Sequence, residues 1–121
     1  MPRGEKVRSA WRMFIAGKWV ESQRGKVFGV TEPATGKPLA AVPEGDARDA
    51  DRAVRAAAKA FESGPWPSLR PPARARVLYE IAEGIQARAE EIARIESRNV
   101  GKPIRDSRDE VAGAAACFEY Y

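Results

Sequence analysis

The chain has 121 residues, of which 44% are hydrophobic and 31% charged, enough for one folded domain with a core of its own. This composition does not favour disorder, and the longest apolar run is far shorter than the roughly 20 residues that span a bilayer. A single cysteine, Cys117, excludes disulfide bonds within the chain. We therefore expect a reducing, cytoplasmic compartment and no membrane partner.

The net charge of +4 is concentrated near the N-terminus. Residues 1–26 contain seven basic and two acidic side chains, and the remaining residues contain 14 basic and 15 acidic ones. Residues 1–12 are predicted to form a basic, flexible tail, and the body of the chain is nearly neutral. No zinc-finger spacing or aromatic RNA-binding motif accompanies the tail, so we expect no nucleic-acid partner.

Three strands are predicted in the first third of the chain. Residues 13–20 and 26–32 are rich in aromatic and β-branched side chains, and the polar loop 21–25 joins them. The stretch PATGK, residues 33–37, then turns the chain. Residues 39–44 form the third predicted strand, which ends at a proline.

After Gly45 the hydrophobic period changes from two to about 3.6, which predicts helices. Asp46 is a suitable N-cap for the first helix, with Asp49 in its first turn, and Gly64 lies near its end. An apolar stripe opposes a basic face on this helix. The stripe consists of Ala50, Ala53, Val54, Ala57, Ala58 and Phe61.

A second helix is predicted from near Pro71 to about Arg98, because proline is tolerated in a first turn. Gly101 and Pro103 then stop it. The third helix begins near Ile104. Its residues 111–118 carry no charge and would cover every side of a helix, so this segment is expected to be buried all round.

Little in the sequence suggests catalysis. The chain has no histidine, which removes the commonest general base and most zinc sites. Cys117 has no adjacent basic residue and is interpreted as a buried structural cysteine. The carboxylates at 90–91 and at 109–110 point apart on a helix and are interpreted as solvated charges. Lys102 follows the end of a helix, where its positive charge is interpreted as a favourable interaction with the negative end of the helix dipole.

Six segments in order resemble the N-terminus of the NAD(P)-dependent aldehyde dehydrogenase superfamily. They are FIAGKWV, EPATGKPLAAVP, DARDADRAVRAAAKAF, GPW, the helix 74–98 and ESRNVGKP. The resemblance spans residues 14–121. Within the superfamily, the sequence is similar to betaine-aldehyde and amino-aldehyde dehydrogenases. It implies an α/β fold in which residues 13–121 are the N-terminal part of the NAD(P)-binding domain, truncated at the C-terminus. A β-hairpin arm and a strand would precede three helices.

The resemblance also implies a function for the parent protein. The parent would oxidise an aldehyde to a carboxylic acid with NAD or NADP and would be a homo-oligomer. The family's nucleophilic cysteine, general-base glutamate and dinucleotide site match no part of this chain, so we assign no catalytic or cofactor-binding residues. The chain alone is expected to be inactive, to bind no cofactor and to self-associate. The alternative is a non-catalytic remnant that docks on a partner chain.

One family feature reaches into this stretch. Many members hold a structural monovalent cation with backbone carbonyls and one side chain, and the matching positions resemble Val30, Thr31 and Asn99. Other ligands would come from beyond the chain. Because a neutral Asn attracts a cation less strongly than Asp does, the residues themselves favour an Asn at a helix end with no ion, and the resemblance alone implies the cation site.

Overall fold

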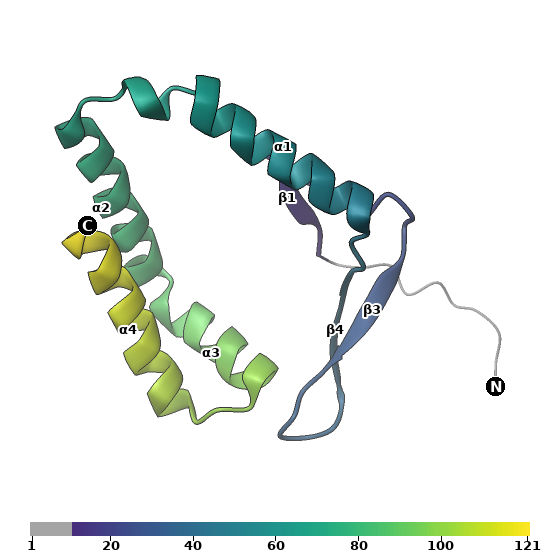
Figure 1. Ribbon diagram of the computed structural model, residues 1–121. Helices are drawn as coiled ribbons and strands as arrows, with labels where there is room; N and C mark the ends of the chain where they lie inside the picture. Colours follow the sequence, from purple (N-terminus) through teal and green to yellow (C-terminus); the bar gives the residue numbers. More distant parts are fainter. Residues whose placement is uncertain (1–10) are drawn as a thin grey trace. The chain divides into compact units, whose positions relative to one another are not determined.

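The computed structural model describes residues 11–121, so the predicted basic tail lies outside the described residues except for its last two positions. The described chain forms two antiparallel hairpins and then four α-helices (Figure 1). Its residues divide into two compact units. The first unit holds the described residues up to 31 and residues 38–67, and the second holds residues 32–37 and 68–121.

The strands of the first unit form two separate hairpins. Strand β1 (Met13–Ile15) pairs with β2 (Lys18–Val20), so the single strand predicted over 13–20 is wrong. The chain reverses at Ala16 and Gly17, whose φ angles of 54° and 76° suit a two-residue hairpin turn. Strand β3 (Val27–Thr31) pairs with β4 (Pro38–Pro43), which confirms the third predicted strand.

Helix α1 (Ala47–Ser63) begins and ends where the sequence predicts. The Asp46 side chain accepts hydrogen bonds from backbone N–H groups of the first turn, and the Asp49 side chain accepts one from the Asp46 backbone N–H. Gly64 is the C-cap at the other end. The predicted apolar stripe stays largely uncovered within the first unit, since the side chains of Val54 and Phe61 are 66% and 76% exposed. A short 3₁₀ helix, η1 (Trp66–Ser68), follows.

Three helices make up most of the second unit: α2 (Pro71–Ala87), α3 (Ala89–Val100) and α4 (Ile104–Tyr120). Helix α4 packs against both α2 and α3. The buried apolar side chains at these contacts are Ala82, Ala93, Val111 and Ala115. No helix in the described part of the chain is long and apolar enough to cross a membrane.

The single helix predicted over 71–98 is wrong, because the structure divides it at Arg88. The backbone of this residue lies outside the helical region, with φ −115° and ψ 16°. Arg88 is both the C-cap of α2 and the N-cap of α3. The break gives four helices in place of three. It also allows Ala82 of α2 and Ala93 of α3 to be fully buried in one core with α4, so tertiary packing overrides a periodicity that continues across the break.

Gly101, the left-handed C-cap of α3, is expected to tolerate no side chain. Its φ is 84°, and a Cβ atom there would lie 3.0 Å from the Cβ of Pro33 in the same unit. We expect Gly101→Ala to lower the free energy of unfolding by about 1–2 kcal/mol in urea denaturation followed by circular dichroism. Gly113→Ala is the control, because a Cβ at Gly113 meets nothing within 4 Å. This substitution should stabilise α4, since Ala has a higher helix propensity than Gly. Equal stabilities for the two variants would contradict this account.

Candidate functional site

The three residues of the predicted cation site lie on two different elements. Val30 is half-buried near the end of β3, and Thr31 is the last residue of that strand, where the pairing register with β4 shifts. Asn99 is exposed in the last turn of α3. The strand belongs to the first unit and the helix to the second, so the site remains a prediction. Asn99 would contribute a neutral amide oxygen, a ligand type that calcium-binding loops also use.

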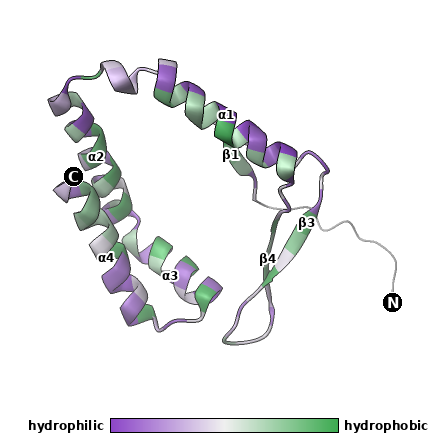
Figure 2. Cartoon of the chain, viewed as in Figure 1, coloured by the Kyte–Doolittle hydropathy of each residue, from purple (hydrophilic) through white to green (hydrophobic). Residues whose placement is uncertain are grey.

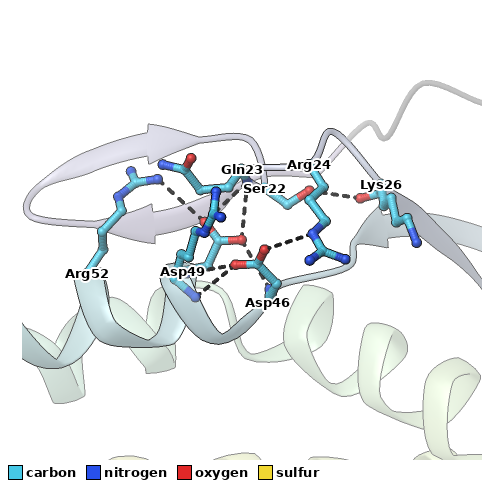
Figure 3. A network of polar contacts seen from close by, with 8 residues as sticks. Ser22, Gln23, Arg24, Lys26, Asp46, Asp49 and Arg52 are labelled. Atoms are coloured by element: carbon cyan, nitrogen blue, oxygen red, sulfur yellow. Dashed lines mark hydrogen bonds and ion pairs between the residues drawn. The ribbon is translucent and has the colours of Figure 1, made fainter.

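The most developed polar cluster of the first unit surrounds the buried carboxylate of Asp49 (Figure 3). Its two oxygens accept the backbone N–H of Gln23 at 3.2 and 3.1 Å, and one also accepts the backbone N–H of Asp46 at 3.1 Å. Arg52 lies 3.4 Å from the same carboxylate. Through the contacts to Gln23 and Asp46, Asp49 attaches the loop after β2 to the start of α1.

A hollow of about 370 Å³ lies beside this cluster, between β1 and the first turns of α1. Met13 and Ile15 of β1 and Ala53 of α1 give it mainly apolar walls. The titratable groups among its lining residues are Asp46 and Asp49, and both accept backbone hydrogen bonds. The hollow therefore suits an apolar side chain better than it suits a reacting group.

Arginines of α3 and α4 enclose the carboxylate of Glu90 in the second unit. Arg108 of α4 donates to both of its oxygens, at 2.8 and 2.9 Å, and Arg94 of α3 donates at 2.8 Å. The hydrogen bonds from Arg108, with the charges of both arginines, lower the pKa of Glu90 from 4.5 to about 2. Its neighbour Glu91 accepts from Arg88 instead, so the two carboxylates do not form an acid–base pair.

Lys102 has a larger role than the predicted interaction with the helix dipole. Its ammonium group contacts Glu110 of α4 and lies 3.0 Å from Glu96 of α3. The hydrogen bonds to Glu110 and then to Glu96 raise the pKa of Lys102. The Ser97 hydroxyl also donates to the Lys102 carbonyl at 2.8 Å. These contacts join the end of α3 to α4 through the connection between them.

Cys117 is exposed in the structure, so its prediction as a buried residue is wrong. The buried face of α4 contains Val111 and Ala115. At about 100° per residue, Cys117 lies about 160° from Ala115, on the opposite side of the helix. None of the ion pairs and hydrogen bonds among the described side chains provides Cys117 with a base, and the chain has no histidine.

Sequence reasoning missed the contacts that join distant segments. Glu32, in the turn 32–37, accepts from Arg98 of α3 at 2.8 Å across 66 positions of sequence. The Thr35 hydroxyl and then Arg98 lower the pKa of Glu32. Helical periodicity reports neighbours three or four residues apart and carries no information on such pairs. The one local signal that pointed to a polar cluster was the capping spacing of Asp46 and Asp49.

Two antiparallel hairpins, a long helix and a packed unit of three further helices define a segment of an α/β protein. The sequence profile of the aldehyde dehydrogenase family matches residues 19–121. The chain therefore belongs to the aldehyde dehydrogenase family.

Individual relatives agree with this assignment. The chain is 38% identical to the phenylacetaldehyde dehydrogenase of Pseudomonas fluorescens over 121 residues, covering 100% of the chain and 24% of that protein. It is 40% identical to the NADP/NAD-dependent aldehyde dehydrogenase PuuC of Escherichia coli (strain K12), covering 91% of the chain and 22% of PuuC. The chain spans about a quarter of the length of the relatives it matches.

A solved structure shows the same arrangement of elements. The betaine aldehyde dehydrogenase of Staphylococcus aureus, in complex with NAD⁺, matches with a TM-score of 0.87 and 32% sequence identity. The match covers 93% of this chain and 23% of that one. The fold observed here is thus that of the N-terminal part of aldehyde dehydrogenases, as the resemblance implied.

We expect Asp49→Ala to destabilise the chain, because it leaves the backbone N–H groups of Gln23 and Asp46 without their acceptor in a part-buried place. The expected loss is about 2 kcal/mol in the free energy of unfolding, measured by urea denaturation. Asp51→Ala is the matched control, since Asp51 is exposed and its ion pair is with Arg55 on the same helix. It should change stability by less than about 0.5 kcal/mol. A loss no greater than that of the control would show that the Asp49 contacts contribute little.

The lowered pKa of Glu90 predicts a specific loss of stability in acid. Folding favours the ionised form of Glu90. The stabilisation of the folded state by this carboxylate is therefore complete above pH 4.5 and is lost as the pH falls from 4.5 towards 2. We expect Glu90→Gln to flatten the decline of the urea midpoint over this interval relative to the unmodified chain. High salt should reduce the difference, because the pair is exposed. Parallel declines in both proteins would refute the assignment to Glu90.

Proposed function

We propose that this chain forms the N-terminal part of an NAD(P)-dependent aldehyde dehydrogenase whose complete polypeptide oxidises an aldehyde to a carboxylic acid. The observation that carries this proposal is the match of 93% of the chain, at a TM-score of 0.87, to a dehydrogenase crystallised with NAD⁺. The names of the relatives from Pseudomonas fluorescens and Escherichia coli support the aldehyde substrate and the use of NAD or NADP.

The role of the chain within that enzyme is to support the site and not to perform the chemistry. Covalent aldehyde oxidation needs a nucleophile, a base and a hydride acceptor held together. The described residues offer an exposed Cys117, and the carboxylates of Glu90 and Glu110 are held by arginine and lysine. The parts that bind the cofactor and the aldehyde are therefore assigned to the polypeptide outside the matched quarter. Val30, Thr31 and Asn99 remain the proposed ligands for a monovalent cation.

The proposal extends to assembly and location. The chain exposes large apolar side chains, among them Trp19, Val54 and Phe61, which favours burial against further polypeptide and self-association when it is isolated. A homo-oligomeric, cytoplasmic parent is consistent with these exposed surfaces and with a single cysteine. The same exposed side chains would also serve the alternative, a non-catalytic chain that docks on a partner.

A chimera tests the proposed function. The matched N-terminal quarter of the Pseudomonas fluorescens phenylacetaldehyde dehydrogenase is replaced by this chain, and NADH formation from phenylacetaldehyde is measured. We expect the chimera to be active and the enzyme that lacks this quarter to be inactive, because the remaining parts lose their support. The 121-residue chain alone should form no NADH. An insoluble or inactive chimera would contradict the proposal, and activity regained only when the chain is added separately would favour the docking alternative.

A further inference from the structure

The break between α2 and α3 coincides with no helix-breaking residue. Arg88 separates the two helices, and the chain changes direction there (Figure 1). Residues 85–93, IQARAEEIA, contain neither proline nor glycine, and most of them are strong helix formers. Sharp turns within a helical segment normally occur at proline, at glycine or at an inserted side chain. The cause of this break therefore lies outside the segment.

The break also removes backbone hydrogen bonds. In a continuous helix the N–H groups of Ala89, Glu90 and Glu91 would each donate to the carbonyl four residues earlier. Helix α3 instead begins at Ala89, where its first N–H groups have no acceptor within the helix and no side chain caps them. Figure 2 shows hydrophobic residues on both sides of the break. Local interactions alone thus favour one straight helix over residues 71–100.

Packing against α4 favours the bent form. Helix α4 contacts both α2 and α3, and these two helices make far fewer contacts with each other than each makes with α4. The apolar side chains at these contacts are almost completely buried. They are Ala82 of α2, Ala93 of α3, and Val111 and Ala115 of α4. Burial of these side chains is the stabilisation that the segment gains from α4.

Two polar contacts hold α4 on either side of the break. Gln86, two residues before Arg88, donates to Glu119 at 2.8 Å. Glu90, two residues after Arg88, accepts from Arg108 at 2.8 and 2.9 Å. Gln86 and Glu90 would be about 6 Å apart along a straight helix, whereas their partners are about 16 Å apart along α4. The bend at Arg88 allows the two side chains to reach separate parts of α4.

We propose that the segment 71–100 has two forms, a bent form when α4 packs against it and one straight helix when α4 is released. Docking of α4 offsets the backbone hydrogen bonds that the bent form gives up at Arg88. The two events are linked in both directions, since a change that straightens the segment must weaken the packing of α4 by the same free energy. Helix α4 follows the segment in the chain, so the straight form comes first during synthesis.

Charges in the buried face of α4 test the proposal in the 121-residue chain. The double variant Val111→Asp and Ala115→Asp places two carboxylates in the core and should release α4. Its control, Ala112→Asp and Ala116→Asp, has the same substitutions at the same spacing but at exposed positions. Faster exchange of the α4 amide protons identifies release, and the control should leave their rates within about twofold of the unmodified chain.

Two NMR measurements at the break report its form. The coupling between the amide and α protons of Arg88 depends on φ, and we expect it to fall about twofold when φ moves from −115° to the helical value of about −63°. The amide protons of Ala89, Glu90 and Glu91 should exchange at least about threefold more slowly, because they gain carbonyl acceptors. Slower exchange is the opposite of what a general loosening of the unit would cause.

Two outcomes of this experiment would overturn the proposal. Release of α4 with an unchanged coupling at Arg88 would show that the break is a local property of the segment. Loss of the helical signals over residues 71–100 would show that the segment forms no helix without α4.

A linker that imposes helical geometry tests the reverse direction and needs no prior release of α4. Ala87→Cys and Glu91→Cys, four residues apart across the break, are bridged by a bis-alkylating linker that fits one helical turn, in a Cys117→Ser background. The matched control bridges Arg76→Cys and Glu80→Cys within α2. All four bridged positions are exposed, and each pair of substitutions removes one exposed ion pair.

We expect the linker across the break to speed the exchange of the Val111 and Ala115 amide protons at least about tenfold relative to the control linker, because straightening costs α4 its packing. Equal exchange rates in the two linked chains would contradict the proposal, whatever the charged variants show.

Discussion

The contact of α4 with both α2 and α3 is the constraint on which the second unit depends. Its buried apolar side chains are mostly alanines, and short side chains bring helix backbones close together. Close packing against two helices at once explains why the chain turns at Arg88 although no proline or glycine stands there. Ion pairs between α3 and α4 then add specificity. Glu90 of α3 pairs with Arg108 of α4, and Lys102, in the connection between the two helices, pairs with Glu110 of α4.

The first unit depends on a polar contact in place of an apolar core. Of its described residues, Ser22 and Asp49 are buried, and both are polar. Asp49 caps its own helix and also holds the backbone of Gln23, so one carboxylate replaces the water that two chain segments would otherwise bind. Beyond this cluster the apolar side chains of β1, β2 and α1 are largely exposed. Such a surface is typical of a segment that completes its core with other polypeptide.

Local patterns predicted most of the elements, and long-range packing explains what they missed. The helix starts at Asp46 and near Pro71 and the stop at Gly101 were predictable, because caps and breakers act through neighbouring backbone groups. The break at Arg88 and the exposure of Cys117 were not, since both depend on which face of a helix meets another helix. The predicted cation ligands, Val30, Thr31 and Asn99, came from family resemblance and not from any pattern of charges.

The ion pairs of the second unit also hold carboxylates in a state that does not favour proton transfer. A general base works best with a pKa near the pH of the reaction, and a carboxylate reaches that range by losing hydrogen bonds and opposite charges. Glu90 shows the reverse, with a pKa of about 2 held by two arginines. Glu32 is likewise held in its charged form by Thr35 and Arg98. Groups arranged in this way fix the positions of helices and turns and are poorly suited to accept a proton near neutral pH.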